Sequence, residues 1–424
     1  MTWRATTLGE LVRIEHGFAF KGEFFAESGR QILLTPGNFH EEGGFRPRPG
    51  KDRFYSGEFP ERYVLERHAL IVAMTEQGEG LLGSAALVPD AETYLHNQRI
   101  GRVKERRELA DRRFLYYLFN TDHVRQQIRN SSSGTKVRHT SPERMYSAGV
   151  TVPEVELQRK IAAILSAYDD LIANNQRRIA LLESMAEEIY REWFVRMRFP
   201  GHQDVRIEKG VPLSWDFVPT REAFEFFGGA TPPKDVGRYW KNGTVNWFTP
   251  TDITGAAGMF LERSKEQCSE EGLESCSARL FPSHSVMLTS RATIGAIGIN
   301  LTPACTNQGF ISCIPNERYP LTFLYHWLKL AKPHFELLAG GSTFPELTKG
   351  TFKRLQVLTP PAQLVVSFDR IVSPQFQAIE TLLKANERLK VTRDALLPRL
   401  ISGKLKVDHL VIQLPPSMRE KVTA

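Results

Sequence analysis

Residues 157–197 read LQRKIAAILSAYDDLIANNQRRIALLESMAEEIYREWFVRM, and the expected architecture follows from this segment. Apolar side chains recur along it at alternating steps of four and three residues, from Ile161 and Leu165 to Ile189 and Trp193. This spacing places them on one narrow stripe of an α-helix. Since neither Gly nor Pro interrupts the segment, we predict a single helix of roughly 60 Å, at 1.5 Å per residue. A helix this long with so thin an apolar stripe is expected to need a partner helix.

A second segment, residues 363–402, has the same spacing and supplies the partner. Asn175 in the first segment and Asn386 in the second each interrupt an apolar row. In an antiparallel pair these asparagines fall opposite each other, and a polar pair in an apolar seam fixes the register although it lowers stability. Pro374 is expected to kink the second helix in its early turns. The alternative is two unrelated core helices, each with a solvated asparagine.

The bulk composition indicates a soluble protein with more than one domain. The chain has 424 residues, which is more than one core accommodates. We expect no membrane partner, because no run of about 18 apolar residues occurs. The first residues lack the layout of a signal peptide, which favours a cytoplasmic location. The net charge of +7 is compatible with a polyanionic partner.

The cysteines indicate reduced thiols rather than a metal site. There are four, Cys268, Cys276, Cys305 and Cys313, in two pairs that each span eight positions. Zinc sites usually bring cysteines in pairs separated by two to four residues. We therefore expect no bound metal in this chain.

The order of predicted segments gives an α+β fold. Residues 1–152 form a mixed domain, 153–199 a long helix, 200–358 a second mixed domain, 359–405 a second long helix and 406–424 a C-terminal tail.

The two mixed domains are predicted to be copies of one unit. Short matches recur in the same order, with an offset that drifts from about 214 to 207 residues: TPGNF at 35–39 and TPTDI at 249–253, NQ at 97–98 and 307–308, FLY at 114–116 and 323–325, and GT at 134–135 and GS at 341–342. If the two long helices pair antiparallel, the domains lie at opposite ends, related by a pseudo-twofold axis. Such a body suits a DNA duplex, whose halves are also related by a twofold axis.

Over essentially its whole length the chain resembles a known family, the specificity (S) subunit of type I restriction–modification systems. The residues that carry the resemblance are GFAF at 17–20, LQ at 157–158, GGATP at 228–232, WFTPTD at 247–252 and LLPRLISGKL at 396–405. The resemblance implies two target-recognition domains, each followed by a long helix, with the two helices pairing as an antiparallel coiled coil.

The resemblance also implies a function and partners. Each target-recognition domain would read one half of a bipartite, asymmetric site on double-stranded DNA. The helices would set the gap between the halves and dock two methyltransferase subunits, and restriction/translocase subunits would complete the assembly. No cofactor is expected in this chain, since S-adenosylmethionine, ATP and Mg would belong to the partner subunits.

The sequence predicts no catalytic residue. Amino-methyltransferases need an Asn/Asp-Pro-Pro-aromatic loop, and none of the Pro-Pro pairs, at 232–233, 360–361 and 415–416, has those neighbours. The phosphate-binding pattern G-x-x-x-x-G-K-[ST] is also missing. Two alternatives stay open: a catalytic methyltransferase or nuclease chain, and a structural coiled-coil scaffold without DNA binding.

The candidate DNA contacts are basic residues for phosphates and polar residues for base edges. In the first domain they are Lys21, Arg46, Arg48, Lys51, Arg53, Gln77, Ser133, Thr135, Lys136 and Arg138. In the second they are Lys234, Arg238, Lys241, Arg291, Ser342, Thr343 and Lys349. For any one of them, the alternative is a solvated surface group. Trp240 and Trp247 are expected in the core rather than stacked on bases.

The helix ends carry apolar bulk. Some of it is expected to cover the domains, and the rest predicts a docking patch for methyltransferase helices. The residues assigned to this patch are Tyr190, Phe194, Leu397, Leu400 and Ile401.

Overall fold

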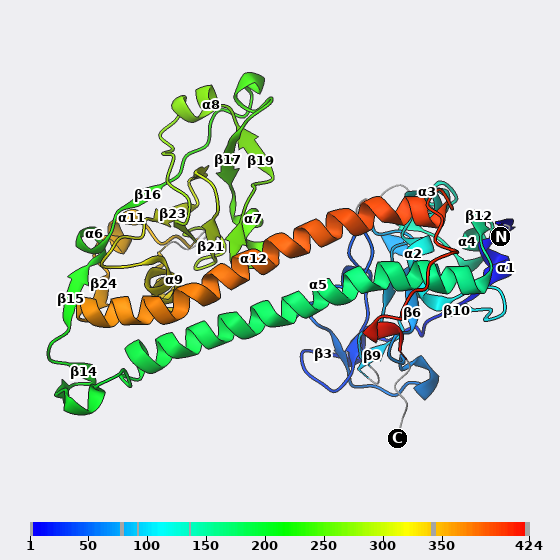
Figure 1. Ribbon diagram of the computed structural model, residues 1–424, viewed down its shortest axis with the longest axis horizontal. Helices are drawn as coiled ribbons and strands as arrows, with labels where there is room; N and C mark the ends of the chain where they lie inside the picture. Colours follow the sequence, from blue (N-terminus) through cyan, green and yellow to red (C-terminus); the bar gives the residue numbers. More distant parts are fainter. Residues whose placement is uncertain (1–2, 77–79, 91–92, 135–136, 341–344, 420–424) are drawn as a thin grey trace. The chain divides into compact units, whose positions relative to one another are not determined.

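The computed structural model of the chain describes residues 3–76, 80–90, 93–134, 137–340 and 345–419 (Figure 1). It contains two compact units. Unit 1 comprises Met1–Ala173 and Arg388–Ala424, and unit 2 comprises Asn174–Glu387. Each unit holds one mixed domain together with a segment of each long helix, α5 (Val155–Tyr190) and α12 (Ala362–Ile401).

Unit 1 is built on a four-stranded antiparallel sheet of order β2-β10-β6-β8 and a smaller sheet of order β3-β5-β4-β9. Its strands are β1 (Arg4–Thr7), β2 (Val12–His16), β3 (Phe25–Ala26), β4 (Ile32–Leu33), β5 (Phe54–Tyr55), β6 (Leu70–Ala73), β7 (Thr75–Glu76), β8 (Ala85–Leu87), β9 (Tyr94–Leu95), β10 (Ile100–Glu105), β11 (Arg138–His139) and β12 (Gly149–Val152). Its helices are α1 (Leu8–Leu11), α2 (Arg112–Phe119), α3 (Asp122–Asn130) and α4 (Pro142–Tyr146), with short 3-10 turns at η1 (Gly22–Phe24), η2 (Pro36–Asn38), η3 (Glu61–Tyr63) and η7 (Pro416–Met418).

Unit 2 is built on a five-stranded sheet of order β16-β23-β20-β21-β18 and a three-stranded sheet of order β19-β17-β22. Its strands are β13 (Ile207–Glu208), β14 (Val211–Pro212), β15 (Asp216–Pro219), β16 (Phe226–Gly228), β17 (Val245–Phe248), β18 (Phe260–Leu261), β19 (Glu266–Cys268), β20 (Val286–Thr289), β21 (Ile297–Asn300), β22 (Ala304–Thr306), β23 (Phe310–Cys313) and β24 (Gln356–Thr359). Its helices are α6 (Thr220–Ala223), α7 (Pro250–Thr254), α8 (Glu270–Glu274), α9 (Leu321–Leu330), α10 (Lys332–Leu338) and α11 (Lys349–Phe352), with turns η4 (Arg191–Val195), η5 (His202–Asp204) and η6 (Gly237–Tyr239).

The two units repeat one plan, which confirms the predicted tandem repeat. The strand order β2-β10-β6-β8 in unit 1 corresponds to β16-β23-β20-β21 in unit 2. The parallel pair β4 and β9 corresponds to the parallel pair β17 and β22. In each unit a strand near the start of the domain pairs antiparallel with the last strand, β1 with β12 and β15 with β24, and the long helix begins directly after that last strand.

Both predicted long helices are confirmed. The first ends as an α-helix at Tyr190 and continues as a single π-helical turn, η4, rather than as α-helix to residue 197. Within unit 2 the helix segments run antiparallel, since Asn175 pairs with Asn386 and the Tyr190 ring lies 5.7 Å from that of Phe368. The Asn175 Nδ2 atom donates to Asn386 Oδ1 at 2.9 Å, so the two asparagines meet as predicted. The second helix is unbroken at Pro374.

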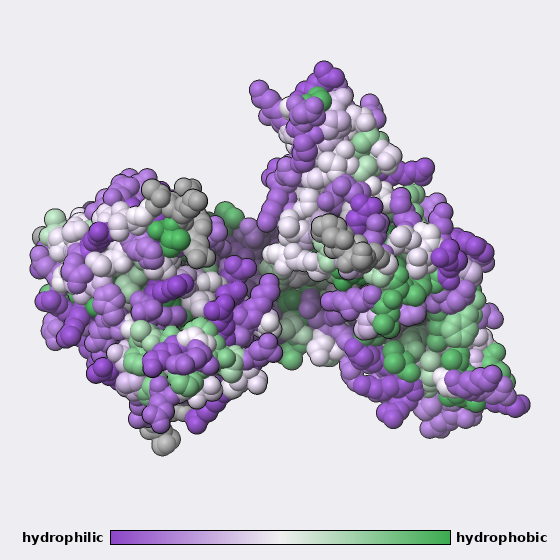
Figure 2. Space-filling model, turned by 180° about the vertical axis from the view of Figure 1, so that it is seen from behind, coloured by the Kyte–Doolittle hydropathy of each residue, from purple (hydrophilic) through white to green (hydrophobic). Residues whose placement is uncertain are grey.

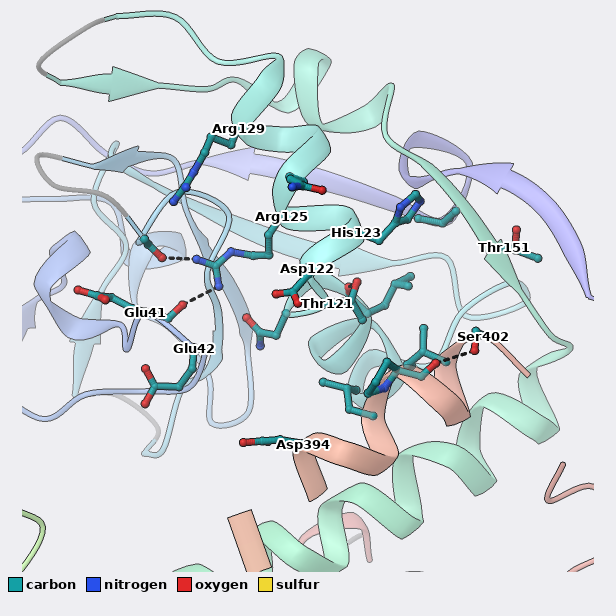
Figure 3. A pocket seen from close by; sticks show the side chains of 18 of the residues that line it. Glu41, Glu42, Thr121, Asp122, His123, Arg125, Arg129, Thr151, Asp394 and Ser402 are labelled. Carbon is teal, nitrogen blue, oxygen red and sulfur yellow. Dashed lines mark hydrogen bonds between the residues drawn. The ribbon is translucent and has the colours of Figure 1, made fainter. Parts of the chain in front are cut away.

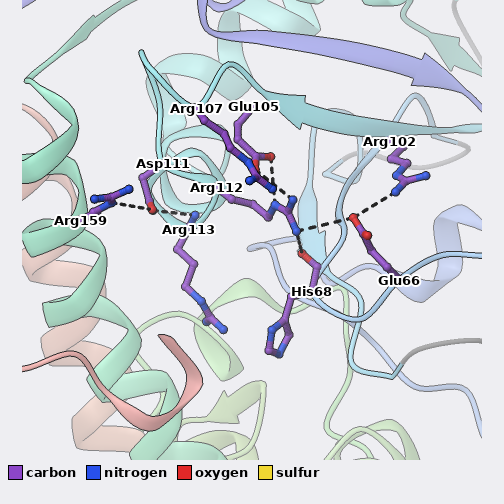
Figure 4. A network of polar contacts seen from close by, with 9 residues as sticks. All are labelled: Glu66, His68, Arg102, Glu105, Arg107, Asp111, Arg112, Arg113 and Arg159. Atoms are coloured by element: carbon purple, nitrogen blue, oxygen red, sulfur yellow. Dashed lines mark hydrogen bonds and ion pairs between the residues drawn. The ribbon is translucent and has the colours of Figure 1, made fainter. Parts of the chain in front are cut away.

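In unit 1 a polar network joins the domain to the first turns of α5 (Figure 4). The Asp111 side chain caps α2 by accepting from the Arg113 and Phe114 amides, and its own amide donates to Gln158 of α5 at 2.9 Å. Arg112 makes a bidentate pair with Glu105, with both N···O distances at 3.0 Å. These charges are matched inside the unit, so the network has a structural role.

The apolar bulk at the helix ends forms core rather than the predicted exposed patch. Tyr190 and Phe194 are 4% and 6% exposed inside the core of unit 2, and Leu400 and Ile401 are 0% and 8% exposed inside that of unit 1. The docking prediction is therefore wrong for these four as surface residues, because each domain uses the adjoining helix to complete its own core. Leu397 is only partly buried.

Each unit also buries one histidine, which makes stability depend on pH. Burial lowers the pKa of His96 in unit 1 and of His326 in unit 2 to about 4. The unfolded chain takes up these protons near pH 6.5, whereas the folded chain does so only near pH 4. The stabilisation is therefore complete above pH 6.5 and is lost as the pH falls toward 4, by about 2 kcal/mol per histidine at pH 5.

We expect the free energy of unfolding from chemical denaturation to fall accordingly between pH 7.5 and pH 5. His326→Phe should reduce this pH dependence, whereas the same measurement on His123→Gln, at an exposed position, should match the unchanged chain. A pH dependence unaffected by His326→Phe would contradict the assignment.

Candidate nucleic-acid interface

The carboxyl ends of the parallel strands β17 and β22 in unit 2 present two rigid polar turns. After β17, the Thr249 amide donates to Asp252 Oδ2 at 2.7 Å and closes a capping box. After β22, the Asn307 side-chain oxygen accepts from the Gly309 amide at 3.0 Å. The Asp252 and Asn307 side chains each hold the backbone of their own turn. Gln308, which lies between Asn307 and Gly309, is therefore exposed on a turn whose backbone is fixed.

A third segment, residues 229–231, crosses close over the turn after β22 at Gly229, a contact called the glycine crossing below. A Cβ atom on Gly229 would lie 2.1 Å from the carbonyl oxygens of both Thr306 and Asn307, which is closer than any side chain allows. The next amide, that of Ala230, donates to the Thr306 carbonyl at 3.0 Å. The crossing places Thr231 beside Gln308, and the Thr231 hydroxyl donates to Gln308 Oε1 at 2.6 Å.

Unit 1 contains the same construction. After β4, the Thr35 amide donates to Asn38 Oδ1 at 2.9 Å in a second capping box. After β9, Asn97 is followed by the exposed Gln98. A Cβ atom on Gly17 would lie 2.2 Å from the Asn97 carbonyl oxygen, and the Phe18 amide donates to the His96 carbonyl at 2.8 Å. The glycine at the crossing, Gly17 in GFAF and Gly229 in GGATP, is thus required for the same reason in both motifs: the backbone approaches too closely for a Cβ atom.

The described residues that flank the two polar Ser/Gly-rich segments also have equivalent places. In unit 2, Arg291, two residues after β20, forms a β-bridge with Glu346, and the Ser290 amide donates to the Gly309 carbonyl at 2.7 Å. In unit 1, β7 pairs with β11, and the Met74 amide donates to the Arg99 carbonyl at 3.1 Å. In each unit, the residue just after β6 or β20 thus donates to the carbonyl of the residue that follows the Asn-Gln turn.

Three of the predicted basic residues of unit 2 border this surface, each in a different setting. The Lys349 ammonium lies 2.3 Å from the point where a Cβ atom of Gly228 would be. Arg291 is ion-paired with Glu346 at 2.9 Å. The Lys234 ammonium lies 3.5 Å from the ring centroid of Trp240 and 2.7 Å from Glu266.

The remaining predicted residues of unit 2 lie elsewhere or outside the described residues. Arg238 pairs with Glu271 at 2.8 Å, and Lys241 is exposed. Ser342 and Thr343 lie outside the described residues. Trp247 is 3% exposed, so it belongs to the core as expected, while Trp240 is half-buried and carries Lys234 on its face.

In unit 1 the described candidate residues lie in three places: at the Thr35 turn, next to β11 and on the exposed surface of the domain. Arg48 lies against the Thr35 turn, with its Nη1 atom 3.4 Å from the Thr35 hydroxyl. Ser133 forms a β-bridge with His139, the neighbour of Arg138 in β11, and the Ser133 hydroxyl accepts from Arg144. The others are exposed side chains of the same domain, Lys21, Arg46, Lys51 and Arg53. Gln77, Thr135 and Lys136 lie outside the described residues.

Three residues of this surface, Gln98, Gln308 and Thr231, were not among the predicted DNA contacts, although the sequence contains a pattern that points to the two glutamines. Gln98 and Gln308 were visible as halves of a repeated Asn-Gln pair, and only the glycine crossing shows why the pair recurs. Thr231 is placed beside Gln308 by the same crossing, from 77 positions away.

A pocket of about 1060 Å³ opens in unit 1 between α3 and the last turns of α12 (Figure 3). Leu397 and Ile401 contribute to its apolar lining. At its rim Arg125 donates to the backbone carbonyls of Glu41, at 2.7 Å, and Leu82, at 3.2 Å. The guanidinium thereby holds two loops of the domain in place.

The face of the molecule shown in Figure 2 is largely hydrophilic, with separate apolar patches. The four cysteines are free thiols. Within the described ranges, His, Cys, Asp and Glu side chains form no group of three that could hold a metal ion. None of the helices in the described part of the chain combines the length and hydropathy of a membrane-spanning segment.

The chain matches the family model described as "Type I restriction modification DNA specificity domain" twice, over residues 1–184 and 212–391. It is 32% identical over 182 residues to the type I restriction enzyme MjaIX specificity subunit of Methanocaldococcus jannaschii, a match covering 42% of each chain. It is 22% identical over 381 residues to the HindI specificity subunit of Haemophilus influenzae, covering 74% of this chain and 82% of that one. In structure it is similar to the S subunit of a type I restriction–modification system from M. genitalium, with a TM-score of 0.57 and 16% identity over 94% of this chain and 96% of the other.

Proposed function

This chain belongs to the type I restriction–modification DNA specificity family, and we propose that each of its two domains reads one half of a split, asymmetric DNA target. The observation that carries the proposal is the duplicated surface, with a glycine crossing, a capping box and an exposed Asn-Gln turn in both units. The backbone is repeated while the surrounding side chains differ. Two readers of this kind suit two different half-sites.

The chemistry of the assembly belongs to partner subunits in this proposal. S-adenosylmethionine would bind two methyltransferase subunits, and ATP and Mg would serve restriction/translocase subunits. The chain itself supplies sequence recognition in the cytoplasm and a surface on which the methyltransferases dock. The antiparallel helix segments of unit 2, with the buried Asn175–Asn386 pair, support a single register of the two long helices there.

Exposed apolar side chains on the first helix support the docking part of the proposal. In unit 2, Leu181 and Met185 are 64% and 55% exposed and lie one turn apart on α5. We expect Leu181→Glu combined with Met185→Glu to prevent co-purification with the methyltransferase, because charge enters an apolar contact. The control is Val411→Glu, at a position 99% exposed in unit 1. Undiminished co-purification of the double variant would place docking elsewhere.

Salt dependence of DNA binding tests phosphate contacts directly. For the complex with methyltransferase, the logarithm of the affinity should fall linearly with the logarithm of salt concentration. Lys349→Ala together with Lys241→Ala should reduce this slope by roughly 2, about 0.9 for each phosphate that is no longer neutralised, with no change in the preferred sequence. Lys406→Ala, at an exposed position of unit 1, is the control. A slope that stays the same in the double variant would show that neither lysine binds phosphate.

Methylated adenines mapped in cells that express the complete system test the function as a whole. A split, asymmetric motif is the expected result. Methyl transfer by the purified chain alone would favour the catalytic alternative, and absence of duplex binding even with the methyltransferase present would leave a structural scaffold.

A further inference from the structure

Each unit exposes one glutamine at the same point of the repeated backbone. In both, the strand before it is buried, the asparagine that precedes it is half-buried, and the glutamine itself is exposed. The strand, the Asn-Gln turn and the glycine crossing hold the backbone of Gln98 in unit 1 and of Gln308 in unit 2. An exposed side chain on so constrained a backbone contributes nothing to the core, so its retention in both copies points to a ligand.

Positive charge borders both glutamines, although other residues carry it in each unit. In unit 2, Lys349 lies over Gly228, next to the glycine crossing. Arg291, which is ion-paired with Glu346, follows Ser290, whose amide donates to the Gly309 carbonyl. In unit 1, Arg99 is exposed directly after Gln98, and Arg48 lies on the turn that follows the neighbouring parallel strand. In both units, basic side chains thus lie on the segments next to a side chain that can reach a base edge.

The side-chain amide carries one acceptor and two donors. Among the four bases, adenine presents the complementary pair in the major groove, its N7 acceptor and its N6 amino donor, and glutamine matches both. We propose that Gln98 and Gln308 are specificity-determining residues, each reading an adenine in the half-site of its own unit. The inference rests on the proposed function and deepens it.

The two glutamines are not equally constrained. The Thr231 hydroxyl donates to Gln308 Oε1 at 2.6 Å and orients that amide. The position that corresponds to Thr231 in unit 1 is Ala19, which has no hydroxyl to donate. The second half-site is therefore read more strictly at its adenine than the first. Thr231→Val, which keeps the shape and removes the hydroxyl, should weaken discrimination at that adenine only.

The first test uses the unaltered complex with its methyltransferase. Single adenines of each half-site, in turn, are replaced in a synthetic duplex by 7-deazaadenine, which lacks the N7 acceptor. One position in each half-site should lose affinity about tenfold. Gln308→Ala should abolish the sensitivity in the second half-site and leave that in the first, and Gln98→Ala should do the reverse. The inference is overturned if either half-site has no such adenine, or if the sensitivity survives the variants.

The second test changes the preferred base. A carboxylate only accepts, and it suits the N4 amino group of cytosine, so Gln308→Glu should change one adenine of the second half-site to cytosine in the methylation motif. Gln98→Glu should change one position of the first half-site. Gln203→Glu and Gln413→Glu, at exposed positions of units 2 and 1, are the matched controls. An unchanged motif with a folded variant overturns the inference, whereas a wild-type complex without any split motif would instead refute the proposed function.

Discussion

Gly229→Ala should abolish reading of the second half-site, with at least about a 100-fold loss of affinity for the cognate duplex and little change for random DNA. The added Cβ would stand 2.1 Å from two backbone carbonyl oxygens, those of Thr306 and Asn307. Neither atom is the end of a flexible side chain, so the two segments must separate, which costs about 3 kcal/mol locally. Separation removes both the Thr231 hydroxyl and the fixed backbone from Gln308.

Gly17→Ala is the matched change in unit 1, where the added atom would stand 2.2 Å from the Asn97 carbonyl oxygen. It should affect the first half-site alone. Gly237→Ala and Gly22→Ala are the controls, since an added Cβ at either position meets nothing within 4 Å. The measurement is the affinity of each variant complex for duplexes with one half-site scrambled. Full discrimination by Gly229→Ala would mean that the crossing does not support recognition.

Asp169→Ala should lower the free energy of unfolding of unit 1 by about 2–4 kcal/mol. The Asp169 carboxylate accepts from the Tyr117 hydroxyl and from Arg393 of α12, both at 2.5 Å. Burial, and then the charge of Asp169, raises the pKa of Tyr117, so this hydroxyl stays protonated and donates. Removal of the carboxylate leaves a partly buried guanidinium and a buried hydroxyl with fewer partners.

The control for this prediction is Asp394→Ala. Asp394 also pairs with Arg393, at 2.8 Å, but its side chain is 59% exposed, so the expected loss is below about 1 kcal/mol. Chemical denaturation at pH 7.5 measures both. Equal effects of the two substitutions would show that Arg393 depends on its total negative surroundings and not on the partly buried partner.

The sequence predicted the two long helices and the asparagine register, because apolar residues recur at helical spacing along each segment. It also predicted the duplicated domain, because short matches recur in the same order. The basic residues predicted to contact DNA also include some that border the candidate interface, among them Arg48, Arg291 and Lys349. These features need no knowledge of which distant segments meet.

What those residues do follows from tertiary contacts. The crossing of Gly229 over Asn307, and the placement of Thr231 on Gln308, join segments 77 positions apart. Long-range packing also decides that Lys234 lies on the Trp240 ring and pairs with Glu266. It likewise buries Tyr190 and Leu400 in the domain cores. A side chain's exposure and partners are set by the segments that pack against it, and spacing along one helix or strand does not contain that information.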